Sequence, residues 1–299
     1  MQIVANGIGI EIDDQGLPAG EPLLLIMGLG MQLTGWPQAL VQMLVSGGFR
    51  VIRMDNRDAG LSQHFDAAGV PSLAWSALRH TLHLHVSSPY AMADMAEDAR
   101  GVLDALGLQR AHVCGASMGG MIAQHLAAKH PQRVKSLTLM MTTSGARRLP
   151  QPGWAVQRAL MSRPGGREPA AVVAHLLRVM GIIGSPAYPP EPEQLRARLA
   201  AMVQRAWHPA GTARQLVAVA ADGDRSALLP RIKAPTRIIH GQADPLVPVA
   251  AGQDLAARIA GAVGDFIPGM GHDLPDALLP RFAAGIAENA ARPGPAAAD

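Results

Sequence analysis

The chain has 299 residues, of which 48% are hydrophobic and 16% are charged. This apolar content is sufficient for a full hydrophobic core and excludes intrinsic disorder over most of the chain. The formal net charge is only +3, and 4 Trp, 4 Phe and 2 Tyr offer few rings for base stacking, so we expect no nucleic-acid partner.

The single cysteine, Cys114, excludes an intrachain disulfide framework. No apolar run approaches the roughly 20 residues of a membrane span, and no secretory signal pattern is present. We therefore expect a cytoplasmic protein without a membrane span.

In chain order, the sequence opens with a β-hairpin pattern around Asn6-Gly7 and then alternates apolar runs with helical periodicity. Unbroken apolar runs are typical of strands that are covered on both faces, so the pattern predicts a mostly parallel, eight-stranded sheet flanked by helices. We expect strands at 2–5, 8–12, 22–27, 49–54, 111–114, 134–141, 236–240 and 263–267, and helices at 37–45, 90–106, 118–130, 249–259 and after Pro275.

Residues 145–230 interrupt this alternation. The segment is rich in Pro, Gly and Arg, and it has helical patches at 155–161, 170–180 and 194–207 without a convincing strand. We therefore expect a helical cap, or lid, inserted into an α/β core that is formed by residues 1–144 and 231–299.

The segment Gly115-Ala116-Ser117-Met118-Gly119 matches the pattern G-x-S-x-G. It lies between an expected strand and an expected helix, which is the strand–turn–helix setting that this pattern requires. Such a turn holds the serine at a strained backbone angle, and the helix start directs free N–H groups and a partial positive charge toward it. Ser117 is therefore the candidate nucleophile.

A serine nucleophile needs a base that takes its proton and an acid that orients the base. In the chain order Ser, Asp, His, both partners should follow later strands of the sheet. Asp244 follows the strand expected at 236–240, and His272 follows the strand expected at 263–267. These two residues are the candidate acid and base.

Four other carboxylates compete with Asp244 for the role of the acid. Asp222 and Asp224 precede the expected strand, and Asp265 lies inside one. Asp273 is the neighbour of the candidate base and cannot easily bend back to its ring. The chain order therefore favours Asp244.

Acyl transfer also requires two backbone N–H groups that bind the developing oxyanion. The residue after the nucleophile, Met118, is one expected donor. Leu29 is the other, in the glycine-rich loop that follows the strand at 22–27.

Methionines flank the loops that carry these candidates, and flexible thioethers suit an adaptable apolar pocket. We expect Gly28, Met31 and Met270 to contact substrate. Cys114 has no adjacent base in this scheme, so we interpret it as a small core residue. The histidines at 80, 83 and 85 have no supporting carboxylate or cysteine, and we expect no metal site and no cofactor.

Six stretches of the chain resemble the α/β-hydrolase superfamily, and within it the aclacinomycin methylesterase type. They are MGLGMQLTGWP (27–37), VIRMDNRDAGLS (51–62), AHVCGASMGGMIAQ (111–124), SLTLMM (136–141), QADPLVP (242–248) and IPGMGHDLP (267–275). The resemblance implies an α/β-hydrolase fold with Ser117, Asp244 and His272 as the triad, in agreement with the assignment above. One departure is Met27, where a histidine commonly precedes the glycine in this superfamily.

The expected function is that of a serine hydrolase that cleaves carboxylic esters of small molecules through an acyl-enzyme intermediate. A C–C bond hydrolase, an amidase and a cofactor-free perhydrolase use the same triad and remain alternatives. A ligand-binding protein with a vestigial site is a further one. We expect a monomer or a homodimer.

Overall fold

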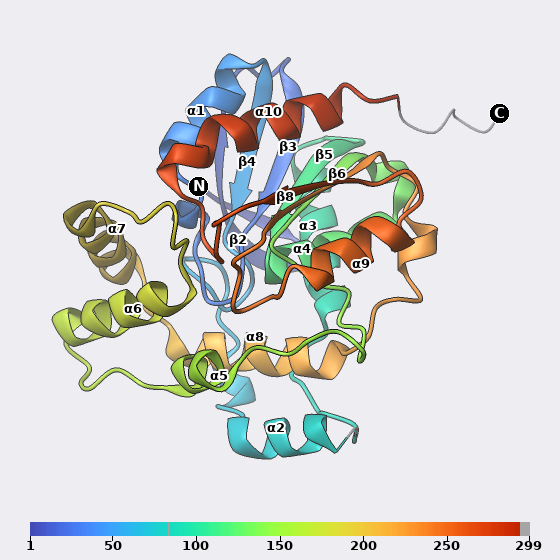
Figure 1. Cartoon of the computed structure of the whole chain (residues 1–299). Coiled ribbons are helices and arrows are strands. Elements are labelled where there is room, and N and C mark those ends of the chain that lie inside the picture. The colour runs from blue at the N-terminus through green and yellow to red at the C-terminus, as the bar shows by residue number, and fades with distance from the viewer. Residues whose placement is uncertain (83, 294–299) are drawn as a thin grey trace.

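The computed structural model describes residues 1–82 and 84–293, and within them eight strands form one sheet (Figure 1). Their order across the sheet is β1-β2-β4-β3-β5-β6-β7-β8. The strands are β1 (Gln2–Ala5), β2 (Ile8–Gln15), β3 (Glu21–Ile26), β4 (Phe49–Met54), β5 (Ala111–Ala116), β6 (Val134–Met140), β7 (Thr236–Gly241) and β8 (Val263–Ile267).

The six strands from β4 to β8 in this order are parallel, whereas β1 and β2 are antiparallel to their neighbours. The hairpin turn between β1 and β2 is confirmed, with positive φ at Asn6 (52°) and Gly7 (77°). The expected mostly parallel, eight-stranded sheet is therefore confirmed. Because parallel strands end at the same edge, the loops that follow β3, β5, β7 and β8 converge there.

Ten α-helices occur in the described part of the chain (Figure 1). Six belong to the α/β alternation: α1 (Gln38–Ser46), α2 (Leu73–Thr81), α3 (Met92–Ala105), α4 (Met118–Lys129), α9 (Ala250–Arg258) and α10 (Leu279–Ala290). Four lie between β6 and β7: α5 (Trp154–Met161), α6 (Pro169–Ile183), α7 (Pro192–Arg205) and α8 (Pro209–Asp222).

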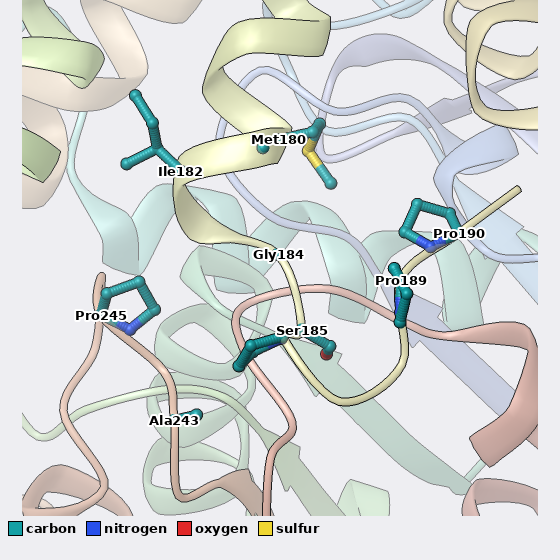
Figure 2. Close-up of a pocket in the computed structure, with 10 residues that line it drawn as sticks. Met180, Ile182, Gly184, Ser185, Pro189, Pro190, Ala243 and Pro245 are labelled. Atoms are coloured by element: carbon teal, nitrogen blue, oxygen red, sulfur yellow. The ribbon is translucent and has the colours of Figure 1, made fainter. Parts of the chain in front are cut away.

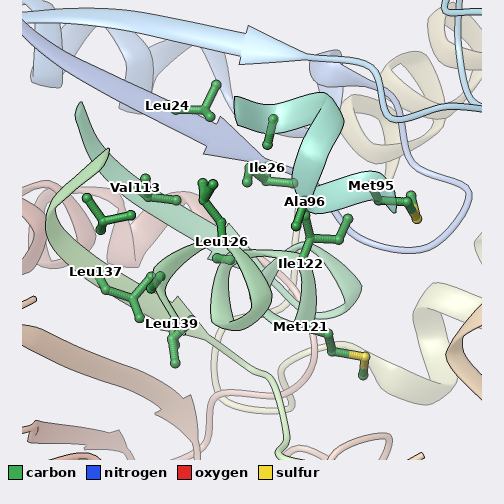
Figure 3. Close-up of a cluster of buried hydrophobic side chains, with 14 of the residues drawn as sticks. Leu24, Ile26, Met95, Ala96, Val113, Met121, Ile122, Leu126, Leu137 and Leu139 are labelled. Carbon is green, nitrogen blue, oxygen red and sulfur yellow. The ribbon is translucent and has the colours of Figure 1, made fainter. Parts of the chain in front are cut away.

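Two hydrophobic cores cover the two faces of the sheet. In β3, Leu24 and Ile26 join the core beneath α3, α4 and α9, whereas Leu23 and Leu25 join the core beneath α1 and α10. Figure 3 shows the first of these cores, in which the side chains of α4 pack against β5 and β6. Burial on both faces explains why the strands read as unbroken apolar runs.

Residues 145–230, which we call the insertion, form helices α5 to α8 beyond one end of the sheet (Figure 1). Its α6 and α7 share a small apolar cluster of their own. A hydrogen bond of 2.8 Å from the Arg225 amide to the Ser144 carbonyl joins the two ends of the insertion. The insertion is thus tied to the sheet where the chain leaves and re-enters it.

Two helices were absent from the sequence-based expectation. Helix α2 is only nine residues long and has no buried residue, and the stretch around it reads as irregular in the sequence. Helix α8 begins with Pro209 at its first turn but also contains Gly211, which weakens its helical pattern. A Cβ at Gly211 would lie 2.1 Å from the Asp58 carbonyl oxygen, so this glycine allows α8 to approach the core closely.

A buried ion pair fixes α8 to the loop after β4. The Asp58 carboxylate accepts from Arg214 Nε at 2.8 Å and Arg214 Nη2 at 2.7 Å, and both side chains are almost fully buried. Burial by itself would raise the pKa of Asp58, but hydrogen bonds from Arg214, the Phe65 amide and Tyr90 hold that pKa below its usual range. Arg214 and these hydrogen bonds therefore oppose the effect of burial on the Asp58 carboxylate.

Arg214→Met leaves the Asp58 carboxylate buried without its counter-charge, so we expect the free energy of unfolding to fall by about 3–5 kcal/mol. Urea denaturation followed by circular dichroism measures this loss. Arg198→Met is the matched control, because Arg198 pairs with Asp276 on the surface at 3.1 Å, and it should cost at most about 1 kcal/mol. Equal losses of unfolding free energy in the two variants would contradict the conclusion that the buried Arg214–Asp58 pair fixes α8 to the loop after β4.

Candidate active site

Ser117 lies on the sharp turn between β5 and α4, with φ 54° and ψ −119°. Its amide donates to the Met140 carbonyl at 2.9 Å, and the Thr142 hydroxyl donates to the Ser117 carbonyl at 2.7 Å. These two bonds come from the end of β6 and beyond, and they hold a backbone conformation that L-residues rarely adopt. The strand–turn–helix setting expected from the sequence is present.

The glycines around Ser117 are required by close backbone contacts. A Cβ at Gly119 would lie 2.0 Å from the Ile26 carbonyl oxygen, and one at Gly115 would lie 2.3 Å from the Gly119 carbonyl oxygen. Both distances are shorter than any real contact, so only glycine fits at these two positions. The packing of α4 against β3 thus requires the second glycine of the G-x-S-x-G pattern, and the tight turn between β5 and α4 requires the first.

The structure brings Ser117, His272 and Asp244 together in one hydrogen-bonded relay. His272 Nε2 lies 3.0 Å from Ser117 Oγ, and His272 Nδ1 lies 2.7 Å from Asp244 Oδ2. The second carboxylate oxygen of Asp244 accepts from the amides of Leu246 at 2.9 Å and Val247 at 2.8 Å. These amides hold the carboxylate in place, so the imidazole is oriented on one side and open to the serine on the other.

The four competing carboxylates are engaged elsewhere. Asp222 accepts from His125 and Arg225, Asp224 from the Ser226 amide, Asp265 from Arg281, and Asp273 from Ser185. Of the carboxylates considered from the sequence, Asp244 is the one that contacts the imidazole of His272.

A second histidine, His240, lies behind the acid. Its Nε2 donates to the Val247 carbonyl at 2.7 Å and lies 3.6 Å from Asp244 Oδ2. Burial lowers the pKa of His240, although the Val247 carbonyl and Asp244 oppose this shift. His240 is therefore a neutral donor that supports the acid loop.

The two expected oxyanion donors lie on loops that meet beside Ser117. Met118 is the first residue of α4, where an amide has no partner within the helix. Leu29 follows Gly28, and a Cβ at Gly28 would lie 3.1 Å from Ser117 Cβ and 3.6 Å from Ser117 Oγ. Within residues 1–82 and 84–293, neither amide donates to another backbone group. This geometry suits a pair of amides that stabilise negative charge next to the hydroxyl.

The insertion holds the loop that carries His272, a feature that sequence reasoning did not find. The His272 amide donates to the Ile183 carbonyl at 2.7 Å, and the Gly271 amide donates to Ser185 Oγ at 2.8 Å. Ser185 in turn donates to Asp273. Burial raises the pKa of Asp273, and the hydrogen bond from Ser185 partly opposes this rise. No local pattern marks Ser185, because its partners lie about 90 residues away in the chain.

The structure places the three residues that were expected to contact substrate in different surroundings. Gly28 lies against Ser117, as described above, and Met31 packs between the core under α1 and the apolar cluster of α6 and α7. Met270 is entirely buried in the core under α1 and α10. In this structure its side chain therefore fills the core and does not face an open pocket.

Two cavities border the insertion. One of about 420 Å³ is lined by the end of α6 and by Ala243 and Pro245, which flank the acid (Figure 2). The other, of about 380 Å³, lies between α2, α5 and α8 and is largely apolar. Met121 of α4 and Leu246 of the acid loop reach its wall. Both cavities therefore adjoin the chain neighbours of Asp244, although the residues that line them do not include Ser117, Asp244 or His272.

One further cluster has metal-ligand chemistry. His64, Asp66 and His208 place ligand atoms within 4.8 Å of one another. The guanidinium of Arg214 lies 2.9 Å from Asp66 and 3.0 Å from His208, so it already supplies the positive charge that a metal would bring.

His83, one of the histidines noted in the sequence, lies outside the described residues. Burial raises the pKa of the Cys114 thiol, as expected of a core residue.

Gly28→Ala places a methyl group beside the Ser117 side chain, so we expect kcat for an ester to fall at least about tenfold, since small misplacements of reacting groups are costly. Initial-rate kinetics measure the fall. Gly165→Ala is the control, because a Cβ there meets no atom within 4 Å. Unchanged turnover in Gly28→Ala would show that this loop does not border the reacting hydroxyl.

Comparisons with known proteins agree with this geometry. A sequence model described as the alpha/beta hydrolase fold matches residues 21–276. The rhodomycin D methylesterase DauP of Streptomyces sp. (strain C5) is 32% identical over 297 residues, which cover 91% of each chain. A 2-hydroxy-6-oxononadienedioate/2-hydroxy-6-oxononatrienedioate hydrolase of Cupriavidus pinatubonensis is 31% identical over 270 residues, which cover 88% of this chain and 84% of the relative.

Solved structures show the same fold. A meta-cleavage product hydrolase of Pseudomonas fluorescens superposes with a TM-score of 0.74 at 20% identity, and the match covers 97% of this chain and 96% of the other. The enol-lactonase of Burkholderia xenovorans superposes with a TM-score of 0.72 at 25% identity, and the match covers 98% of this chain and 100% of the other. The chain therefore belongs to the α/β-hydrolase fold family.

Proposed function

We propose that Ser117 is the nucleophile of a serine hydrolase, with His272 as its general base and Asp244 as the residue that orients the base. The observation that carries the proposal is the continuous relay from Ser117 Oγ through the imidazole to the Asp244 carboxylate. The reaction is the hydrolysis of a carboxylic ester, and it needs no cofactor.

In the first half-reaction, Ser117 Oγ attacks the ester carbonyl while His272 Nε2 takes the hydroxyl proton. The amides of Leu29 and Met118 stabilise the tetrahedral oxyanion. His272 then gives the proton to the departing alcohol, which leaves an acyl group on Ser117. In the second half, His272 takes a proton from water, water attacks the acyl group, and the carboxylic acid leaves as Ser117 recovers its proton.

The substrate that we propose is a methyl ester of a bulky apolar acid. Two relatives at 32% identity carry the name rhodomycin D methylesterase. The largely apolar cavity between α2, α5 and α8 offers space for an apolar acyl group near the relay. We further propose that the insertion acts as a cap over the site.

Cleavage of a carbon–carbon bond is the second candidate. Several relatives at 27–31% identity are named as hydrolases of 2-hydroxy-6-oxononadienedioate. The same triad serves both reactions, so substrate shape and not the relay distinguishes them.

No helix in the described part of the chain is long and apolar enough to cross a membrane. Three features stay predictions: a small-molecule ester as the partner, a cytoplasmic location, and a monomeric or homodimeric state.

Ser117→Ala removes the nucleophile, so turnover of a short-chain nitrophenyl ester should fall by at least about 10³-fold, with residual activity from the oxyanion site and binding. Mass spectrometry should show one equivalent of a fluorophosphonate on Ser117 of the wild type and none on the variant. Ser162→Ala, a change in the loop after α5, is the control and should keep both activities. Near-full turnover in Ser117→Ala would overturn the proposed function.

A substrate panel tests the reaction class. We expect kcat/KM for methyl esters of bulky aromatic acids to exceed the values for matched amides and for vinylogous diketone ring-cleavage products by at least about 100-fold, or about 2.7 kcal/mol. A higher kcat/KM for the diketones would favour the C–C hydrolase instead. The release of methanol measures the esters, the release of amine measures the amides, and the loss of absorbance measures the diketones.

A further inference from the structure

The loop that carries Leu29 is held at its two ends by the core. At one end the Asn56 side-chain amide donates to the Met27 carbonyl at 2.8 Å. At the other end the Leu33 amide donates to Asp55 Oδ1 at 2.6 Å. Both anchors come from the loop after β4. They fix where the loop begins and ends. Between them the Met31 amide donates to the Gly28 carbonyl at 3.2 Å and closes a turn, in which the described backbone hydrogen bonds leave the peptide between Leu29 and Gly30 unheld.

The middle of this loop is held from the insertion, by Gln215 of α8. The Gly30 amide donates to Gln215 Oε1 at 2.8 Å, and Gln215 Nε2 donates to the Arg57 carbonyl at 2.7 Å. The Gln215 side chain is fully buried. A single amide side chain therefore joins the loop after β3 to the loop after β4, with both of its polar ends satisfied.

The bond to Gly30 has a direct geometric consequence for Leu29. The Gly30 N–H and the Leu29 carbonyl share one planar peptide unit, so the bond fixes the orientation of that plane. Gly30 has a φ of 65°, and glycine can leave this conformation at little steric cost. Without the bond from Gln215, the peptide plane that follows Leu29 can rotate, and only the 3.2 Å bond from the Met31 amide to the Gly28 carbonyl is left to hold the plane of the Leu29 amide.

Two further contacts fix the position of helix α8 next to the loop of Leu29. Arg214, the neighbour of Gln215, forms the buried ion pair with Asp58. A Cβ at Gly30 would lie 2.8 Å from Thr212 Oγ1, so α8 also packs directly on the loop. The insertion thus presents a fixed acceptor to the loop that supplies an oxyanion donor.

We propose that Gln215 is a positioning residue for the oxyanion site: it holds the Gly30 peptide so that the Leu29 amide points at the reacting carbonyl oxygen. This inference rests on the proposed function of Ser117. Gln215 acts through the loop backbone, so its loss should weaken stabilisation of the tetrahedral oxyanion and leave ground-state binding of substrate intact.

Gln215→Met keeps the length and burial of the side chain but removes both hydrogen bonds. We expect kcat for a nitrophenyl ester and the rate constant for phosphonylation of Ser117 by a fluorophosphonate to fall about 10- to 100-fold. KM should change by less than about twofold, because ground-state binding is kept. Gln215→Glu keeps an acceptor for the Gly30 amide and should recover part of both rates. Gln215→Asn is one methylene too short to reach Gly30, and it gives the same test as Gln215→Met if the latter does not fold.

Asn289→Leu is the matched control for loss of a buried amide. Asn289 is also fully buried, and its side chain donates to the Leu137 carbonyl at 2.9 Å, away from the oxyanion loop. This variant should lower the melting temperature and leave both rates within about twofold of the wild type.

The outcomes separate the two proposals. Failure of the fluorophosphonate to label Ser117 in the wild type would overturn the proposed function itself. Labelling of the wild type together with equal rates in Gln215→Met and Asn289→Leu would overturn the positioning role alone. A rise in KM with unchanged kcat, or a Gln215→Glu variant as slow as Gln215→Met, would also contradict it.

Discussion

The left-handed backbone of Ser117 is the constraint on which the rest of the site depends. A φ of 54° is costly for serine, and it persists because β6, Thr142 and the close packing of α4 on β3 hold the turn. The turn lifts the hydroxyl out of the sheet toward the loops that follow β3, β7 and β8. Each of those loops then needs only to place one group near that point: an amide, a carboxylate or an imidazole.

The insertion is a structural part of this site, because polar contacts join it to two of the three loops. Ser185 and the Ile183 carbonyl hold the loop of His272, and Gln215 holds the loop of Leu29. Such contacts couple the placement of the insertion to the geometry of the relay. A change in the insertion that moves Ser185 or Gln215 therefore also moves the loops that carry His272 and Leu29.

Buried charge accompanies these contacts. The Arg214–Asp58 pair lies beside Gln215, and Arg205 pairs with Asp55, which also anchors the Leu33 amide. Burial raises the pKa of Asp55 although the amides of Leu33 and Leu61 and the Arg205 guanidinium oppose the shift. Ion pairs of this kind contribute little net stability, but they are costly to break, so they fix one arrangement of the insertion against the core.

The amino-acid sequence by itself determined the eight strands, most of the helices, the turn that carries Ser117 and the positions of Asp244 and His272 after strands. These features depend on local periodicity, on glycine spacing and on chain order, which can all be read along the chain. Only the tertiary structure decided which carboxylate contacts the imidazole of His272, that Met270 is buried in the core, and that Gln215 and Ser185 bind the loops of Leu29 and His272. The physical reason is that these contacts join residues from about 30 to nearly 190 positions apart, and no local pattern specifies the partner of a buried polar group.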